Sequence, residues 1–156
     1  MKKLTFLFLA FIISQSGIAK IWKIGASRSY TKPSAVAALV SNGDTVEIDA
    51  AVYANDVAKW TANNLVLKGI GGLAHLKSGG TASGGKAIWV IGGNDCKIEY
   101  IEFSECTSVD LNGAGIRQEG KNLMVSHCFF HESDYCPLKS LINSSICFCC
   151  AAILAF

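Results

Sequence analysis

The sequence lacks an excess of charge of either sign. It carries 14 Lys and Arg against 12 Asp and Glu, and two of the basic residues, Lys2 and Lys3, belong to the leader described below. Without these two, 12 basic residues balance 12 acidic ones, and the remaining chain is formally neutral. Because affinity for phosphate backbones comes largely from clustered positive charge, we expect no nucleic-acid partner.

The sequence also lacks the run of roughly 20 apolar residues that a membrane-spanning helix requires. Its first apolar run, Leu4 to Ile13, is shorter, follows Lys2 and Lys3, and is followed by polar residues and then Gly17-Ile18-Ala19. This order is typical of a secretory signal peptide. We therefore expect residues 1–19 to be a signal peptide and the protein to be secreted, periplasmic or located at the cell surface.

The cysteines are not spread through the chain as a disulfide framework would require. Three lie in the body of the chain and four near its end: Cys96, Cys106, Cys128, and Cys136, Cys147, Cys149, Cys150. Cys128 lies in an apolar strand pattern, and we interpret it as a small core residue. A disulfide between Cys96 and Cys106, which flank one predicted strand, remains an alternative.

Helical periodicity is confined to one short segment. Pro33 and Ser34 precede the apolar residues 35–40, and Asn42-Gly43 follows them, which predicts a short helix with Val36, Leu39 and Val40 on one face. From Asp44 the period changes to two residues, so Val46 and Ile48 face one side and Glu47 the other. Further short strands are predicted without intervening helices: 65–67, 87–91, 98–103, 115–117 and 123–130.

The short strands repeat along the chain. Residues 98–105 align with residues 125–132, 27 positions later, and residues 85–89 align with 113–117, 28 positions later. Residues 65–70 align with 98–103, 33 positions later, if a turn contains an insertion. Repeated short strands without helices between them favour a solenoid in which each coil stacks on the previous one.

The segments Asn42–Tyr53 and Asn64–Gly72, followed by these repeats, resemble the right-handed parallel β-helix proteins of the pectate-lyase-like superfamily. The resemblance covers about residues 35–132. It implies an all-β fold, a right-handed parallel β-helix of about three to four coils with a short N-terminal capping helix. Residues 20–134 would form the N-terminal part of that domain.

The last residues, 135–156, depart from the repeat, since they are apolar and Cys-rich and lack turn glycines. Three interpretations remain open. They are a frameshifted or truncated reading frame, a C-terminal membrane anchor, or an apolar cap over the last coil.

The resemblance also implies a substrate class and a catalytic group. Lyases of this kind use a basic side chain, aided by Ca²⁺, to take the proton next to a uronate carboxylate, and Arg117 is the candidate for that role. The alternative is a surface arginine facing Glu119. Trp89, Trp60 and Tyr53 are candidate sugar-stacking residues if they are exposed, and Trp89 is expected to point outward.

No cofactor other than this implied Ca²⁺ is evident, and no metal site is predicted. His127, Cys128, His131, Glu132 and Asp134 are close in sequence, but alternate residues of a strand point to opposite faces. Glu99, Glu102 and Glu105 are interpreted as solvated. The leading hypothesis is a secreted or cell-surface β-helix domain related to polysaccharide-processing lyases, without a complete active site. The alternative is a non-catalytic glycan-binding or adhesion module.

Overall fold

The computed structural model describes residues 18–134 and the strand Ile153–Ala155. Most of the predicted signal peptide, residues 1–17, and residues 135–152 and 156 of the atypical tail lie outside the described residues. Among residues 18–134, none belongs to a helix with the length and apolar character needed to cross a membrane.

The strands form three parallel sheets, which we name A, B and C. Sheet A contains β1 (Ile21–Ile24), β2 (Thr45–Asp49), β5 (Val66–Ile70), β8 (Lys97–Glu99) and β11 (Met124–Ser126). Sheet B contains β3 (Val52–Ala54), β6 (Ala74–Lys77), β9 (Ile101–Ser104) and β12 (Phe129–His131). Sheet C contains β4 (Ala58–Trp60), β7 (Ala87–Ile91), β10 (Ala114–Gln118) and β13 (Ile153–Ala155).

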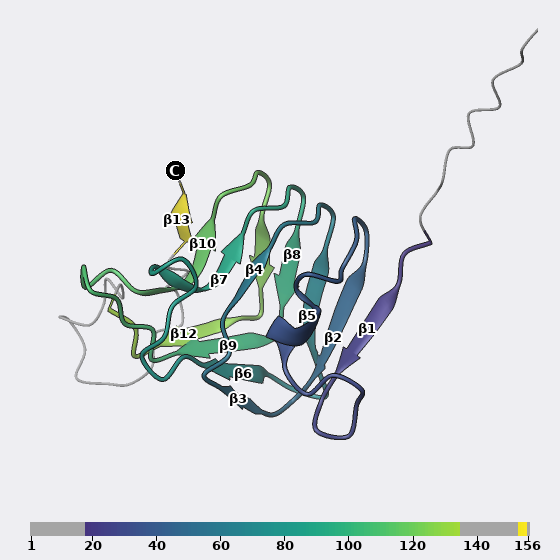
Figure 1. Ribbon diagram of the computed structural model, residues 1–156, viewed down its shortest axis with the longest axis horizontal. Coiled ribbons are helices and arrows are strands. Elements are labelled where there is room, and N and C mark those ends of the chain that lie inside the picture. Colours follow the sequence, from purple (N-terminus) through teal and green to yellow (C-terminus); the bar gives the residue numbers. More distant parts are fainter. Residues whose placement is uncertain (1–17, 135–152, 156) are drawn as a thin grey trace, which may run out of the picture.

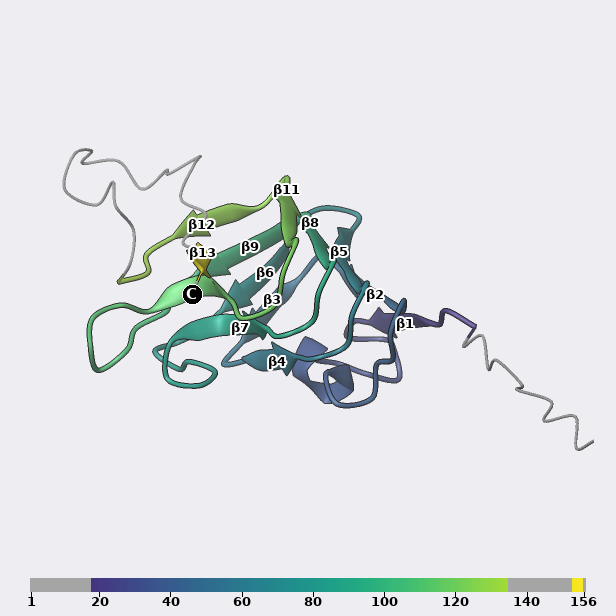
Figure 2. The same ribbon diagram turned by 90° about the horizontal axis from the view of Figure 1, so that it is seen from above.

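The chain visits sheets A, B and C in turn and then returns to sheet A one strand further along. Successive coils therefore stack from β1 toward β12 along the long axis (Figure 1). Viewed from above, the strands of sheet B lie side by side in the order β12, β9, β6 and β3 (Figure 2). The predicted all-β parallel β-helix of about three to four coils is confirmed as a parallel β-solenoid of about four turns.

The observed register confirms one predicted offset and corrects two. Ile98 pairs with Val125, 27 positions later as predicted. Ala87 pairs with Ala114, also 27 positions later, so the predicted offset of 28 is wrong. Leu67 pairs with Ile98, which replaces the predicted offset of 33 by one of 31. A slip of one residue would exchange the inner and outer faces of a strand, so the correction from 28 to 27 changes which residues of β7 and β10 share a face.

The predicted helix over residues 35–40 is reduced to one 3₁₀ turn, η1 (Pro33–Val36). Val36 is buried as predicted, but Leu39 is 49 % exposed and does not share that apolar face. The side chain of Asp56 holds this turn in place. Its carboxylate accepts hydrogen bonds from the backbone N–H and the hydroxyl of Ser34.

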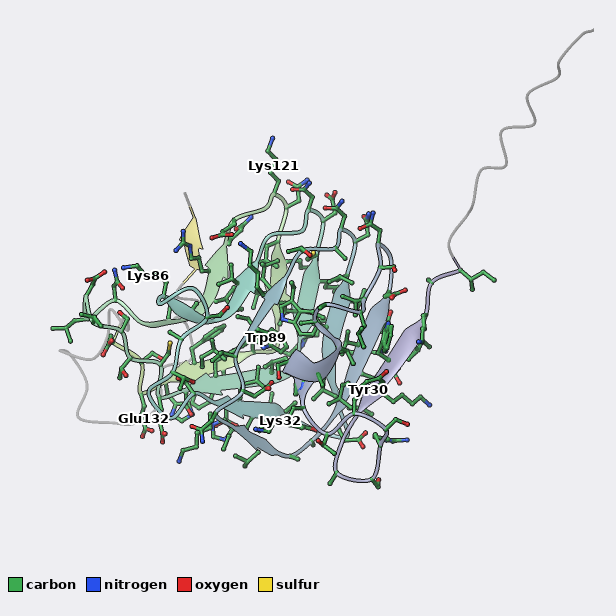
Figure 3. The ribbon with its side chains drawn as sticks, viewed as in Figure 1. Tyr30, Lys32, Lys86, Trp89, Lys121 and Glu132 are labelled. Carbon is green, nitrogen blue, oxygen red and sulfur yellow. The ribbon has the colours of Figure 1, made fainter. Side chains whose placement is uncertain are left out.

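The core lies between the three sheets and grows along the axis of the solenoid. Its aromatic members contact one another from coil to coil, with ring centroids 5.4 Å apart for Trp60 and Trp89, 5.3 Å for Trp89 and Phe103, and 5.0 Å for Phe103 and Phe130. Figure 3 labels Trp89 in the middle of the stacked coils. Because the aromatic rings fill the interior, the polar side chains that remain available for function lie on the outer faces of the sheets.

Candidate functional site on the outer face of sheet B

The outer face of sheet B carries two ladders of side chains, and we call it the sheet B face. The first ladder contains Val52, His75, Glu102 and Phe129, and the second contains Ala54, Lys77, Ser104 and His131. Neighbours in each ladder come from successive coils. The parallel register therefore brings together residues that are far apart in sequence.

A cluster of His75, Glu102 and His131 occupies the centre of the sheet B face. Nε2 of His131 lies 2.9 Å from Oε1 of Glu102, within hydrogen-bond distance, and Nε2 of His75 lies 3.7 Å from the same oxygen. The centroids of the two imidazole rings are 5.8 Å apart. All three side chains are mostly buried, with exposed fractions of 21 %, 22 % and 16 % for His75, Glu102 and His131.

Burial and charge act on His75 in opposite directions. Burial disfavours the imidazolium and lowers the pKa of His75, nearby Glu102 raises it, and His131 lowers it again, with a net lowering from the usual value. The neutral imidazole of His75, with a lone pair on one nitrogen, is therefore favoured near neutral pH.

Ser104 and His75 do not form a hydrolase triad with Glu102. Nε2 of His75 lies 2.7 Å from Oγ of Ser104, and Glu102 approaches the same nitrogen. In a triad the carboxylate must bind the other ring nitrogen, so that it orients the imidazole while Nε2 takes the serine proton. Ser104 is also almost fully buried. The arrangement instead brings ligand atoms of His75, Glu102 and His131, which can each offer a lone pair, within 4.8 Å of one another.

An exposed aromatic pair lies at the corner between sheet A and sheet B. The Tyr100 and His127 rings stack with centroids 4.7 Å apart and an interplanar angle of 14°. Tyr100 and His127 occupy the same corner in successive coils, and both have positive φ angles, 56° and 54°. Tyr100 is 44 % exposed and is the one exposed Tyr, Trp or Phe among residues 18–134.

The three residues predicted to stack on sugars are buried instead. Trp89 and Trp60 are 0 % exposed and Tyr53 is 4 % exposed. The expectation that Trp89 points outward is wrong because its ring packs against Trp60 and Phe103 inside the solenoid. Tyr53 also points inward, and its hydroxyl donates a hydrogen bond to the carbonyl of Asp49. None of these rings is available to a ligand in this structure.

Arg117 lies on the outer face of sheet C, on the other side of the core from the cluster. Its guanidinium forms an ion pair of 3.2 Å with Glu119, as the alternative interpretation of the sequence expected. Glu119 also pairs with Lys59 at 2.9 Å. The hydrogen bond from Lys59, and then the charges of Lys59 and Arg117, lower the pKa of Glu119 despite partial burial. The catalytic role of Arg117 remains a prediction.

The Ca²⁺ implied by the resemblance does not fit the cluster on the sheet B face. Calcium takes six to eight oxygen ligands, whereas two of the three groups here are imidazoles. We therefore derive no role for Ca²⁺ from it.

Cys96, Cys106 and Cys128 are free thiols, so the alternative of a Cys96–Cys106 disulfide is wrong. Burial raises the pKa of the Cys106 and Cys128 thiols to about 11.

Sequence reasoning found parts of this site but did not assemble it. Glu102 was interpreted as solvated, His131 was compared only with its neighbours in sequence, and His75 was not considered. The signal that could have found the cluster was the 27-residue spacing that separates residue 75 from 102 and residue 104 from 131.

Comparison with known protein families, characterised proteins and solved structures finds no match for the chain.

Proposed function

We propose that this protein is an exported, non-catalytic β-helix module that binds a polysaccharide on the sheet B face. The observation that carries the proposal is the exposed Tyr100 ring, stacked on His127 from the next coil. An aromatic ring offers a flat apolar face to the C–H groups of a sugar, and His127 behind it holds the ring in place. Export and a location outside the cytoplasm follow from the leader-like sequence of residues 1–19 and are part of the proposal.

The backbone at Tyr100 supports a role for the ring beyond packing. A φ angle of 56° is uncommon for a tyrosine, whereas Asn and Gly adopt it readily. The fold needs this turn, but it does not need an aromatic side chain there. A strained position occupied by an exposed ring is consistent with a binding role.

The sheet B face beside the Tyr100 corner, together with Glu105 after β9, provides groups that bind hydroxyls. A sugar chain lying along β9 from Tyr100 would pass Glu102 and reach Glu105, whose carboxylate pairs with Lys77 at 2.8 Å. Carboxylates accept hydrogen bonds from sugar hydroxyls, and the ammonium of Lys77 donates hydrogen bonds to sugar oxygens. Since ligand sites combine aromatic side chains with a small number of placed polar groups, the surface suits this class of ligand.

Affinity electrophoresis through gels containing polygalacturonate, alginate or a neutral glucan tests the proposal. We expect at least one polysaccharide to retard the full chain, and Tyr100→Asn to weaken binding roughly tenfold, about 1.4 kcal/mol. Asn tolerates the left-handed backbone, so the variant keeps the fold while losing the ring. Leu111→Asn is the matched control, because Leu111 is also exposed and has a φ angle of 56°. Equal binding by wild type and Tyr100→Asn would contradict the proposal.

Polysaccharide lyase activity at Arg117 is the second candidate, favoured by the half-buried cationic side chain on sheet C. The pairing with Glu119 counts against it, since the carboxylate stabilises the protonated guanidinium, whereas a general base must be neutral. Incubation with polygalacturonate or alginate, with and without Ca²⁺, separates the two candidates. Appearance of unsaturated product absorbance, abolished by Arg117→Ala, would replace the binding module by a lyase.

A further inference from the structure

The His75, Glu102 and His131 side chains converge from three successive coils on strands β6, β9 and β12. One ligand atom from each lies within 4.8 Å of the other two. We propose that these three residues form a binding site for one divalent transition-metal ion of the Zn²⁺ class. The site shares Glu102 with the proposed path of the sugar chain, but metal binding needs neither Tyr100 nor a sugar.

The spacing of the ligand atoms suits such an ion. In a tetrahedral Zn²⁺ site with bonds of about 2.0 to 2.1 Å, neighbouring ligand atoms lie roughly 3.3 Å apart. The two distances from Oε1 of Glu102 are 2.9 Å to Nε2 of His131 and 3.7 Å to Nε2 of His75. Shifts of about half an ångström would bring both distances to this value, a change within reach of side-chain rotation, and the ligand nitrogens of His75 and His131 lie within 4.8 Å of each other.

The surroundings hold the two imidazoles in place. Phe129 stacks on the ring of His131 with centroids 4.9 Å apart. Glu132 lies 3.8 Å from Nδ1 of His131, where its carboxylate favours a proton on Nδ1 and leaves Nε2 for the ion. Ser104 contacts Nε2 of His75 at 2.7 Å and would yield that nitrogen to the metal by rotation of its hydroxyl. Because the three side chains keep exposed fractions of 16 to 22 %, water can supply a further ligand.

The donor set decides between classes of metal. Two imidazoles and one carboxylate favour Zn²⁺, Co²⁺, Ni²⁺ or Cu²⁺ over Ca²⁺ and Mg²⁺, which require mainly oxygen ligands. Lys77 is the cation on the same face, and its pairing with Glu105 offsets the charge that would repel a metal ion. Glu102 and Glu132 provide the negative charge next to the ion.

Titration of the metal-free full chain with Co²⁺ tests the site, because the ligands determine the absorption spectrum. We expect one Co²⁺ per chain, with weak visible d–d bands and without the intense near-ultraviolet band of thiolate ligands. This distinction matters because the chain contains seven cysteines, which also bind such metals. A thiolate band with the full stoichiometry, or no binding at millimolar Co²⁺, would overturn the proposal.

Variants identify the ligands. His75→Gln, Glu102→Gln and His131→Gln should each weaken Co²⁺ and Zn²⁺ binding at least tenfold, while circular dichroism remains that of the wild type. Glu99→Gln is the matched control, because Glu99 has the same side chain three residues earlier but lies on sheet A, paired with Lys97 and Ser126. Unchanged affinity in folded His131→Gln and Glu102→Gln would exclude this site. A chain that binds a polysaccharide but no metal would contradict only this inference.

Discussion

The indole N–H of Trp22 donates a hydrogen bond of 2.8 Å to the buried carboxylate of Asp44, which precedes the adjacent strand β2. Asp44 also accepts hydrogen bonds from the backbone N–H groups of Lys20 and Ser41. One side chain therefore joins β1 to the first coil. Because three donors would lose their acceptor, we expect Asp44→Ala to lower the free energy of unfolding by about 3 kcal/mol. Asp110→Ala, which removes an exposed carboxylate, should cost less than about 1 kcal/mol. Urea denaturation measures both, and similar values would contradict this role of Asp44.

Asp44 also predicts a pH dependence of stability. Burial acts to raise the pKa of Asp44, but the hydrogen bonds from Ser41, Trp22 and Lys20 outweigh it and hold the pKa below the usual 3.8. The folded state therefore binds fewer protons than the unfolded state just below this pH. This contribution is present above about pH 3.8 and is lost as the pH falls toward the lowered pKa of the folded state. In unfolding measured from pH 6 to pH 3, wild type should lose more stability than Asp44→Asn. Parallel curves would show that Asp44 has no lowered pKa.

Gly115 shows how closely successive coils pack. A Cβ atom at this position would lie 2.5 Å from the Phe130 ring and 2.9 Å from Cβ of Phe103. Since both rings belong to the stacked core, we expect Gly115→Ala to cost about 1 to 3 kcal/mol in thermal or urea unfolding. Gly92→Ala is the control, because its nearest neighbour, the carbonyl of Trp60, would be 3.5 Å away. Equal stability of the two variants would mean that β10 and β12 do not pack as described.

Asparagine side chains connect the turns that lead into successive strands of sheet A. Oδ1 of Asn42 accepts the backbone N–H of Asn63, Oδ1 of Asn63 accepts that of Asn94, and Oδ1 of Asn94 accepts that of Lys121. Lys121 marks the last of these turns in Figure 3. We expect Asn94→Ala to cost about 1 kcal/mol, because these hydrogen bonds are exposed and water partly replaces them. Asn94→Asp keeps an acceptor and should cost less. Denaturation midpoints give both values, and a larger loss for Asn94→Asp would contradict this explanation.

The sequence predicted the repeated coils because inward residues leave a regular signal. Val46 and Ile48 face the core and Glu47 faces outward, as their alternation indicated. The repeat from Ile98 to Val125 was found because the corner turns of these two coils have equal lengths. An apolar residue at every second position is sufficient for this inference at β2, since only one face of that strand is buried.

The candidate site depends on turn lengths that the sequence pattern did not determine. The chain uses nine residues from Leu67 to Leu76 (76 − 67) but five from Ile98 to Phe103 (103 − 98), although both pairs are in register. This difference concealed the alignment of His75 with Glu102. Trp89 was assigned to the wrong face for a different reason, because all five residues of β7 are buried and leave no alternation.

The most direct test of the account is to map where a bound oligosaccharide contacts the full chain, using backbone amide chemical shifts in NMR spectra. The oligosaccharide is taken from whichever polysaccharide retards the protein. We predict that the largest changes occur at residues 97–105 and 124–131, around Tyr100 and along β9, and that Tyr100→Asn reduces them. Changes centred on residues 114–119, around Arg117 on sheet C, would contradict binding on the sheet B face.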